Sequence, residues 1–97
     1  MRIVARKTIK DVWETNGDAA QPLKSWFREA ERADWATPHD VKVAYRNASV
    51  IVNSRIVFNI AGNKYRLVVR FNYAYRVGYI RFIGTHAQYD AIDAENI

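Results

Sequence analysis

Residues 55–72 read RIVFNIAGNKYRLVVRFN. Apolar and polar side chains alternate through two runs of this stretch, and Ala61-Gly62-Asn63 separates the runs. Alternation with a period of two is typical of a strand with one buried face, and turn residues between two such runs predict a hairpin. We therefore expect antiparallel strands at Arg55–Ile60 and Lys64–Phe71.

The sequence after this hairpin predicts a third strand and a short helix. Residues 72–75 have the composition of a turn, residues 76–83 alternate again, and Gly84-Thr85 ends the run. Thr85 and Gln88 then have the spacing of a capping box, which begins helices. Tyr89 and Ile92 should form the inward face of this C-terminal helix.

The N-terminal half has the periodicity of helices. Residues 2–5 are apolar enough for an edge strand, and residues 7–16 place apolar side chains at helical spacing before Asn16-Gly17, a plausible stop. Pro22 should lie in the first turn of a second helix that continues to Ala33, because proline is tolerated there. Thr37-Pro38 predicts a short helical turn to about residue 45, whereas residues 47–53 are ambiguous.

This order of elements predicts an α+β fold. The N-terminal strand and a two-helix hairpin should pack on one face of a mainly antiparallel sheet, with a short C-terminal helix. The 97 residues are enough for one domain, residues 1–97, around one core.

Composition excludes several classes of protein. Hydrophobic residues make up 49% of the chain and charged residues 26%, which indicates a globular protein. The absence of cysteine excludes disulfide scaffolds and zinc–cysteine sites, and suits a cytoplasmic protein. No apolar run is long enough to span a membrane, and no signal-peptide core is recognisable.

Charge is segregated along the chain. Residues 1–40 carry seven basic and seven acidic side chains, residues 41–89 carry eight basic and no acidic ones, and residues 90–97 carry three acidic ones, which sums to the net charge of +5. A solvated surface normally mixes both signs. The acid-free tract therefore favours an anionic polymer or an acidic protein as partner, although a generally basic small protein is the plainer alternative.

Alternation predicts where these cations point. On the central strand the apolar side chains should face the helices, which leaves Lys64, Arg66, Val68, Arg70 and Asn72 on the opposite face. On the preceding strand the same face should carry Arg55, Val57 and Asn59. On the third strand we expect Ile80 and Phe82 inward, with Tyr79 and Arg81 outward. Such a face suits RNA, and the RNA-binding candidates are Lys64, Arg70, Arg81, Arg55 and Asn59.

His86 opens the predicted C-terminal helix and is the candidate general base. RNA is cut without a metal ion when the ribose 2′-hydroxyl attacks the adjacent phosphorus; this needs a base, an acid and a cation. Arg66, with Arg70 or Arg81, could stabilise the charge, and Tyr89 or Lys64 could assist proton delivery. A lone histidine at a helix start is otherwise often an ordinary surface residue. No cofactor is expected, and the acid-free tract argues against a magnesium site.

The chain resembles a known family in two strings. Residues 57–69 read VFNIAGNKYRLVV and residues 79–90 read YIRFIGTHAQYD, and both are similar to the HigB toxin family of bacterial toxin–antitoxin systems, within the wider RelE group. Arg66 matches the RelE arginine that follows the tyrosine of the central strand. His86 stands where RelE has a second arginine, Val57 and Asn59 replace its two lysines, and Tyr89 lies earlier than its C-terminal tyrosine.

This resemblance implies a function and two partners. It implies a RelE-like fold and a metal-independent endoribonuclease that cuts mRNA on the ribosome, with His86, Arg66 and Tyr89 as the catalytic set. It also implies an antitoxin with a helix-turn-helix, similar to HigA, that represses the shared operon.

Two other functions stay open on the residues alone. The same basic face could bind RNA or the ribosome and inhibit translation without cleavage. DNA binding through a helix is the weaker alternative, because neither N-terminal helix is strongly basic.

Overall fold

The computed structural model describes all residues from 1 to 97 and contains five strands and four helices. In chain order these are β1 (Arg2–Val4), α1 (Arg6–Thr15), α2 (Gly17–Arg32), α3 (Pro38–Ala44), β2 (Ser49–Ile51), β3 (Arg55–Ile60), β4 (Tyr65–Asn72), β5 (Val77–Thr85) and α4 (His86–Asp90). The strands form one sheet in the order β1-β5-β4-β3-β2. Only the β1–β5 pair is parallel. The predicted α+β fold with a mainly antiparallel sheet is confirmed.

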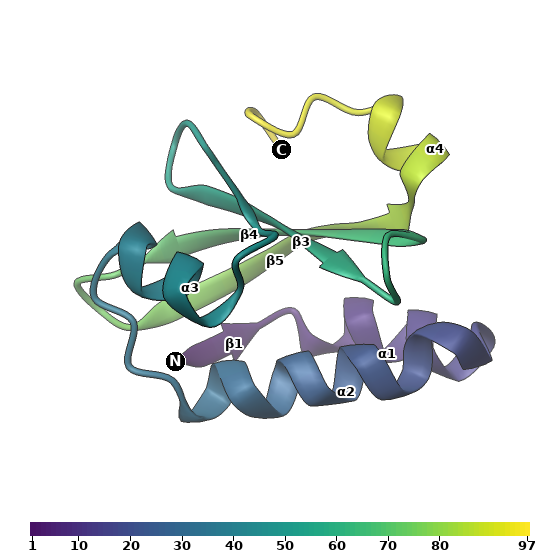
Figure 1. Ribbon diagram of the computed structural model, residues 1–97, viewed down its shortest axis with the longest axis horizontal. Helices are drawn as coiled ribbons and strands as arrows, with labels where there is room; N and C mark the ends of the chain where they lie inside the picture. Colours follow the sequence, from purple (N-terminus) through teal and green to yellow (C-terminus); the bar gives the residue numbers. More distant parts are fainter.

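The sheet has helices on both faces, and the two faces differ. Figure 1 shows α1 and α2 lying along one face, while α4 and the C-terminus lie over the other. We call the face toward α1 and α2 the inner face and the opposite one the outer face. The ambiguous stretch after α3 forms the edge strand β2.

The main core lies between the inner face and the helices. Trp26 of α2 packs edge to face on Phe58 of β3 with ring centroids 5.2 Å apart, and Phe58 lies 6.3 Å from Phe71 of β4. The side chains predicted to face inward are buried as expected: Ile56, Phe58 and Ile60 of β3, and Tyr65, Leu67, Val69 and Phe71 of β4. Alternation therefore predicted the inner face of these two strands correctly.

The outer face is less open than the sequence indicates. Val57, Val68 and Ala94 form a second apolar cluster, against which Phe82, Tyr89, Ile92 and Ile97 pack. The expectation that Val57 and Val68 lie on an open surface is wrong, because the C-terminal segment folds back and leaves Val57 only 1% exposed. Tyr89 and Ile92, which were predicted to face inward, both pack in this cluster, although α4 ends at Asp90 and Ile92 lies beyond it.

A bulge between β4 and β5 changes the orientation of one predicted residue. Val68 pairs with Phe82 and Val69 with Ile80, so Arg81 is an extra residue without a partner on β4. Ile80 faces inward as expected, but the expectation for Phe82 is wrong, since it packs in the outer cluster. An extra residue reverses the alternation on one side of it, and nothing in the local pattern marks its position.

Proline 22 lies inside a helix and not in its first turn. The helix α2 begins at Gly17, directly after Asn16, so Pro22 is its sixth residue. A proline there costs about 3 kcal/mol through the lost backbone hydrogen bond and steric conflict. Burial of Leu23, Trp26 and Phe27 on the same helix offsets this, at about 1.5–3 kcal/mol for each large apolar side chain. The prediction was wrong because tertiary packing decided where the helix begins.

Candidate functional site

The end of the outer face is built by β4, β5 and α4. Arg66 of β4 pairs with Gly84 of β5, two residues before α4 begins. The predicted capping box is present: the Thr85 hydroxyl accepts from the Gln88 backbone N–H at 3.2 Å, and the Gln88 side chain accepts from the Thr85 N–H at 2.8 Å. A side chain at Gly84 would place its Cβ 2.6 Å from Gln88 Oε1, so glycine lets α4 start this close to the sheet. His86 therefore begins α4 next to β4.

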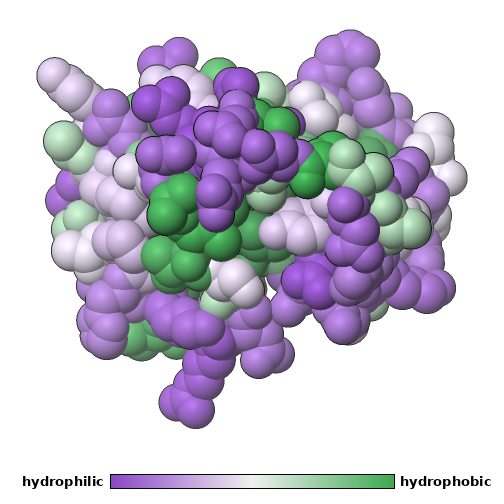
Figure 2. Space-filling model, turned by 90° about the horizontal axis from the view of Figure 1, so that it is seen from above, coloured by the Kyte–Doolittle hydropathy of each residue, from purple (hydrophilic) through white to green (hydrophobic).

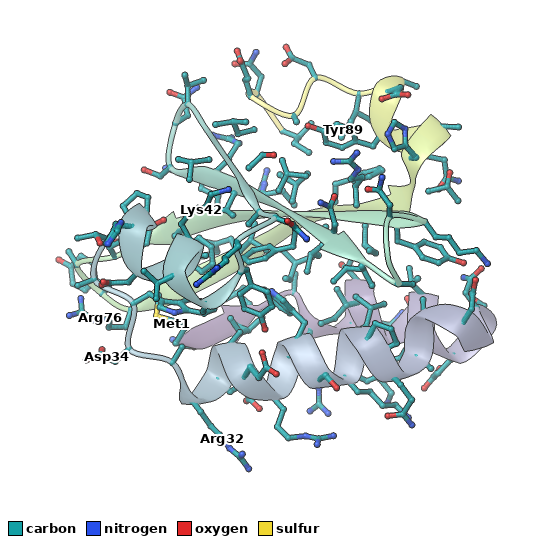
Figure 3. All side chains as sticks on the ribbon, in the orientation of Figure 1. Met1, Arg32, Asp34, Lys42, Arg76 and Tyr89 are labelled. Atoms are coloured by element: carbon teal, nitrogen blue, oxygen red, sulfur yellow. The ribbon has the colours of Figure 1, made fainter.

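Arg66 lies against Tyr89. Its guanidinium carbon is 5.5 Å from the centroid of the Tyr89 ring, a cation–π contact. Tyr89 in turn packs on Phe82, with ring centroids 6.4 Å apart, and Figure 3 shows it beside α4 above the sheet. The Arg66 Nε is buried and has no hydrogen-bond partner. The aromatic contacts hold an arginine whose hydrogen-bonding capacity is not used within the chain.

His86 lies next to the same strand and has an acidic neighbour. Its backbone N–H donates to the Lys64 carbonyl at 3.2 Å, and its Nδ1 is 3.1 Å from Asp90 Oδ2. The histidine side chain remains 49% exposed. Arg66, His86 and Tyr89 are thus brought together by one β4–α4 junction, and we call them the Arg66 cluster.

Asp90 was missed as a possible functional residue. In the sequence it is one of three acidic residues of the last segment and the end of the second family string, and neither feature gives it a role in the site. Its spacing from His86, four residues along a helix, was the available signal, because side chains at i and i+4 are neighbours. A carboxylate on one imidazole nitrogen orients the ring and leaves the other nitrogen free for chemistry.

The eight cations of the acid-free tract divide into two groups. Four are bound within the chain, through carboxylates or backbone carbonyls: Lys42, Arg55, Lys64 and Arg76. The other four make no side-chain hydrogen bond or ion pair: Arg46, Arg66, Arg70 and Arg81. Three of these unpaired arginines are on β4 and β5, so the charge available to a ligand is concentrated on these two central strands.

Three predicted RNA-binding residues make contacts within the chain. Lys64 does not face outward as expected, because it lies just before β4 and pairs with Asp18 of α2 at 2.8 Å. Arg55 is on the outer face but is 9% exposed, and its Nε donates to the Ile97 carbonyl at 2.9 Å. Asn59 donates to the Asn47 carbonyl at 3.0 Å.

Arg70 and Arg81 are exposed and unpaired. Arg70 lies on β4 opposite Tyr79, which is half-buried and faces outward as predicted. Figure 2 looks onto this side of the molecule and shows mainly hydrophilic residues around a smaller exposed apolar patch. The structure therefore provides a polar surface with unpaired guanidinium groups along its central strands.

The Lys64–Asp18 pair shifts the pKa of both groups. The hydrogen bond from Lys64 lowers the pKa of the Asp18 carboxyl, with a further contribution from the Tyr65 hydroxyl, which donates to Asp18 at 2.9 Å. The hydrogen bond to Asp18 raises the pKa of Lys64. This pair joins α2 to the start of β4 and so belongs to the scaffold that supports the Arg66 cluster.

The structure contains neither a metal-ligand cluster nor a membrane-spanning helix. No three His, Asp or Glu side chains lie close enough together to hold a metal ion. None of the helices has the length and apolar character needed to cross a bilayer.

The helices packed on a mainly antiparallel sheet, with a short helix at the C-terminal end, give the chain a RelE-like α+β fold. The model of the HigB toxin family, described as the RelE-like toxic component of a toxin–antitoxin system, matches residues 19–92. The chain is also 23% identical over 94 residues to the mRNA interferase HigB of Escherichia coli O6:H1 (strain CFT073), covering 95% of this chain and 91% of that protein. The chain belongs to the HigB toxin family and is the toxin of a toxin–antitoxin system.

Proposed function

We propose that this toxin is an endoribonuclease that cuts mRNA on the ribosome without a metal ion, by attack of the ribose 2′-hydroxyl. The observation that carries the proposal is the Arg66 cluster. A guanidinium group with no hydrogen-bond partner lies on the ring of Tyr89, at the junction where His86 begins α4. A cation, an imidazole and a phenol are the kinds of group that phosphodiester cleavage requires, and the β4–α4 junction carries one of each.

In the proposed reaction His86 is the general base. Its nitrogen accepts the proton of the 2′-hydroxyl, and the 2′-oxygen then bonds to the adjacent phosphorus. Asp90, 3.1 Å from Nδ1, orients the ring so that Nε2 faces the substrate. The tract from residue 41 to 89 carries no carboxylate, which supports a reaction that uses side chains for these steps.

Arg66 and Tyr89 complete the proposed reaction. The guanidinium of Arg66 stabilises the negative charge that develops on the phosphorane oxygens. The bond from phosphorus to the 5′-oxygen breaks, and the Tyr89 hydroxyl donates its proton to that oxygen. The products are a 2′,3′-cyclic phosphate and a 5′-hydroxyl. Lys64 is the less suitable acid, because it is bound to Asp18.

RNA binding would fall to the unpaired arginines of the two central strands, β4 and β5. Arg81 and then Arg70 lie along the sheet away from Arg66 and would contact successive phosphates on one side of the cleavage position, because they have no partner within the chain. The side chains of Arg55 and Asn59 donate hydrogen bonds to backbone carbonyls of the chain, so they would support this surface more than bind RNA directly.

The test is to induce the toxin alone in growing cells and map the 5′ ends of transcripts. We expect growth arrest and new 5′ ends within coding regions. His86→Ala and Arg66→Ala should each restore growth and remove the new ends, although the variants remain folded. Arrest without new ends would instead favour a protein that binds RNA or the ribosome and does not cut.

The antitoxin is the second proposed partner. Membership of the family implies an antitoxin. We propose that it has a helix-turn-helix, is similar to HigA and represses the shared operon. Its co-expression should abolish the growth arrest; survival of the arrest in the presence of bound antitoxin would contradict this.

A further inference from the structure

A second group of unpartnered side chains lies on the outer face, away from the Arg66 cluster. Arg70 of β4 and Tyr79 of β5 pair directly across the sheet. Arg70 is exposed and without a partner, and the half-buried Tyr79 stacks on no other ring and makes no side-chain hydrogen bond. The guanidinium and the aromatic ring are therefore both available to a ligand.

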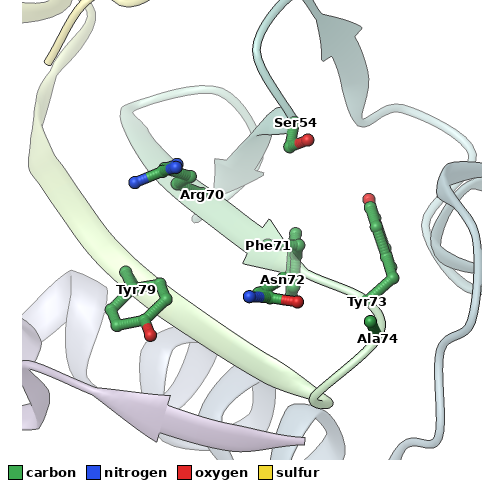
Figure 4. A pocket seen from close by; sticks show the side chains of 7 residues that line it. All are labelled: Ser54, Arg70, Phe71, Asn72, Tyr73, Ala74 and Tyr79. Carbon is green, nitrogen blue, oxygen red and sulfur yellow. The ribbon is translucent and has the colours of Figure 1, made fainter.

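These two residues line a cavity. Its volume is about 440 Å³, and Ser54, Asn72 and Tyr73 also line it; we call it the Arg70 cleft. Figure 4 shows Arg70 and Tyr79 on neighbouring strands, with Asn72 and Tyr73 beyond them and Ser54 at the opposite wall. A volume of this size falls within the range for small-molecule sites, about 300–1,000 Å³, and suits one nucleotide better than a double helix.

The walls of the Arg70 cleft are held in place by the backbone. The Phe71 N–H donates to the Ser54 carbonyl at 2.9 Å, which fixes the β2–β3 turn against the end of β4. Asn72 Oδ1 accepts from the Tyr75 backbone N–H at 3.3 Å. The side-chain oxygen of Asn72 is therefore occupied by this hydrogen bond, whereas the side-chain nitrogen, Nδ2, is left as a donor.

The cleft combines the groups that recognise an unpaired nucleotide. A guanidinium binds phosphate, an aromatic ring stacks on a base, and an amide donor with a hydroxyl can bond to a base edge. A neighbouring cavity of about 450 Å³ shares Ser54 and Arg70 and also contains Glu95. That carboxylate disfavours phosphate on its side, so the phosphate should lie on the Arg70 side away from Glu95.

The position of the cleft relative to the Arg66 cluster fixes which nucleotide it can hold. Arg66 and Arg70 are four residues apart on one strand and face the same way, which separates their Cα atoms by about 13 Å. Arg81 lies between them along β5. A nucleotide in the cleft is therefore not the one that is cut but one further along the same strand of RNA.

We infer that the Arg70 cleft binds a single unpaired nucleotide of the mRNA beside the cleavage position, with its phosphate on Arg70 and its base against Tyr79. This inference rests on the proposed function and adds a selectivity site to it. Because Asn72 offers a donor, the cleft should favour bases that present an acceptor toward it. The cleft would thus bias which codons are cut.

The experiment compares Tyr79→Ala with Tyr75→Ala. Tyr75 is 77% exposed in the adjacent turn and does not line the cleft, so it is the matched control. Binding is measured by fluorescence anisotropy with a single-stranded 2′-O-methyl oligoribonucleotide, which the proposed reaction cannot cut, and transcript 5′ ends are mapped in parallel. The Tyr79→Ala protein loses one base-stacking contact, so its affinity for the oligoribonucleotide should be about 5- to 140-fold lower than that of the wild type. The Tyr75→Ala protein should bind with the wild-type affinity.

The outcomes separate this inference from the proposed activity. Equal binding by the two tyrosine variants would overturn the inference, whether or not the wild type cuts mRNA. Binding that depends on Tyr79, together with a wild type that creates no new 5′ ends, would support the cleft and overturn the catalytic proposal. If Tyr79→Ala does not fold, Arg70→Gln decides: the slope of log affinity against log salt should fall by about 1, and an unchanged slope would contradict the inference.

Discussion

Replacing Arg66 by alanine should separate activity from stability. The change removes the cation–π contact with Tyr89, which contributes about 0.5–1 kcal/mol. The wild type also has a cost of about 1–3 kcal/mol for the buried Arg66 Nε, which has no hydrogen-bond partner, and the substitution relieves that cost. These two effects oppose each other, so the free energy of unfolding should change little. For a domain of this size a net change of 1 kcal/mol would move Tm by about 4–8 °C.

The effect of the same change on cleavage should be much larger. Removing one group that stabilises transition-state charge typically lowers the rate by about 10²–10³-fold. The assay is single-turnover cleavage of a model mRNA on purified ribosomes, with Tm measured on the same preparations.

Arg32→Ala is the matched control for this prediction. It removes the same charge from α2, on the opposite side of the molecule, where Figure 3 shows Arg32 projecting away from the sheet. The control should cut at the wild-type rate. A folded Arg66→Ala protein that cuts as fast as the wild type would refute the assignment, as would an equal loss in Arg32→Ala.

Three further predictions concern the elements that support the cluster. Thr85→Ala removes the cap of α4, and should lower the free energy of unfolding, measured in urea, by about 0.5–2 kcal/mol. It should also lower the rate of mRNA cleavage. An unchanged cleavage rate would show that the start of α4 does not position the site. Phe58→Ala should cost about 3–5 kcal/mol, because the ring is 1% exposed and packs on Trp26; a loss below 1 kcal/mol, measured the same way, would contradict the packing. The pKa of the Asp18 carboxyl in the folded protein lies below its usual 3.8, so the stability that Asp18 contributes is present above that value and is lost as pH falls through the folded pKa. Asp18→Asn should therefore lose less stability than the wild type between pH 5 and 2, as measured by thermal melts. Parallel curves of stability against pH for the two proteins would exclude a contribution from the Asp18–Lys64 pair.

Most of the fold could be predicted because local patterns decide it. The alternation of residues 55–72 specifies two strands and their buried face, and the Thr85–Gln88 capping box specifies where α4 starts. Each of these signals lies within a few residues of the feature it determines. These local signals agree with the fold as a whole, as is usual in natural sequences.

The errors arose where distant parts of the chain meet. The burial of Val57 depends on residues 92–97, which fold back over β3 and β4, and no local pattern indicates that contact. Phe82 was assigned to the wrong face because Arg81 is inserted as a bulge, and a bulge depends on the neighbouring strand. The intrinsic preference of proline favours a first turn for Pro22, but the buried face of α2 extends the helix back to Gly17.

The residues of the candidate site could be predicted from the sequence, but which of them are free to bind a ligand could not. The position of His86 and the acid-free tract are evident in the sequence. The sequence does not show which of the cations are unpaired, because Lys64 pairs with Asp18 of a distant helix and Arg55 donates to the carbonyl of Ile97. The sequence therefore indicates a basic face, and the structure shows which cations of the acid-free tract are unpaired: Arg46, Arg66, Arg70 and Arg81.

The most direct test of the proposed chemistry is cleavage of an mRNA with one 2′-deoxy nucleotide at the position that is normally cut. Attack by the 2′-hydroxyl predicts that this message survives on the ribosome with the toxin bound, while the all-ribose message yields a 2′,3′-cyclic phosphate and a 5′-hydroxyl. Cleavage of the deoxy-substituted message at the same bond would contradict the account.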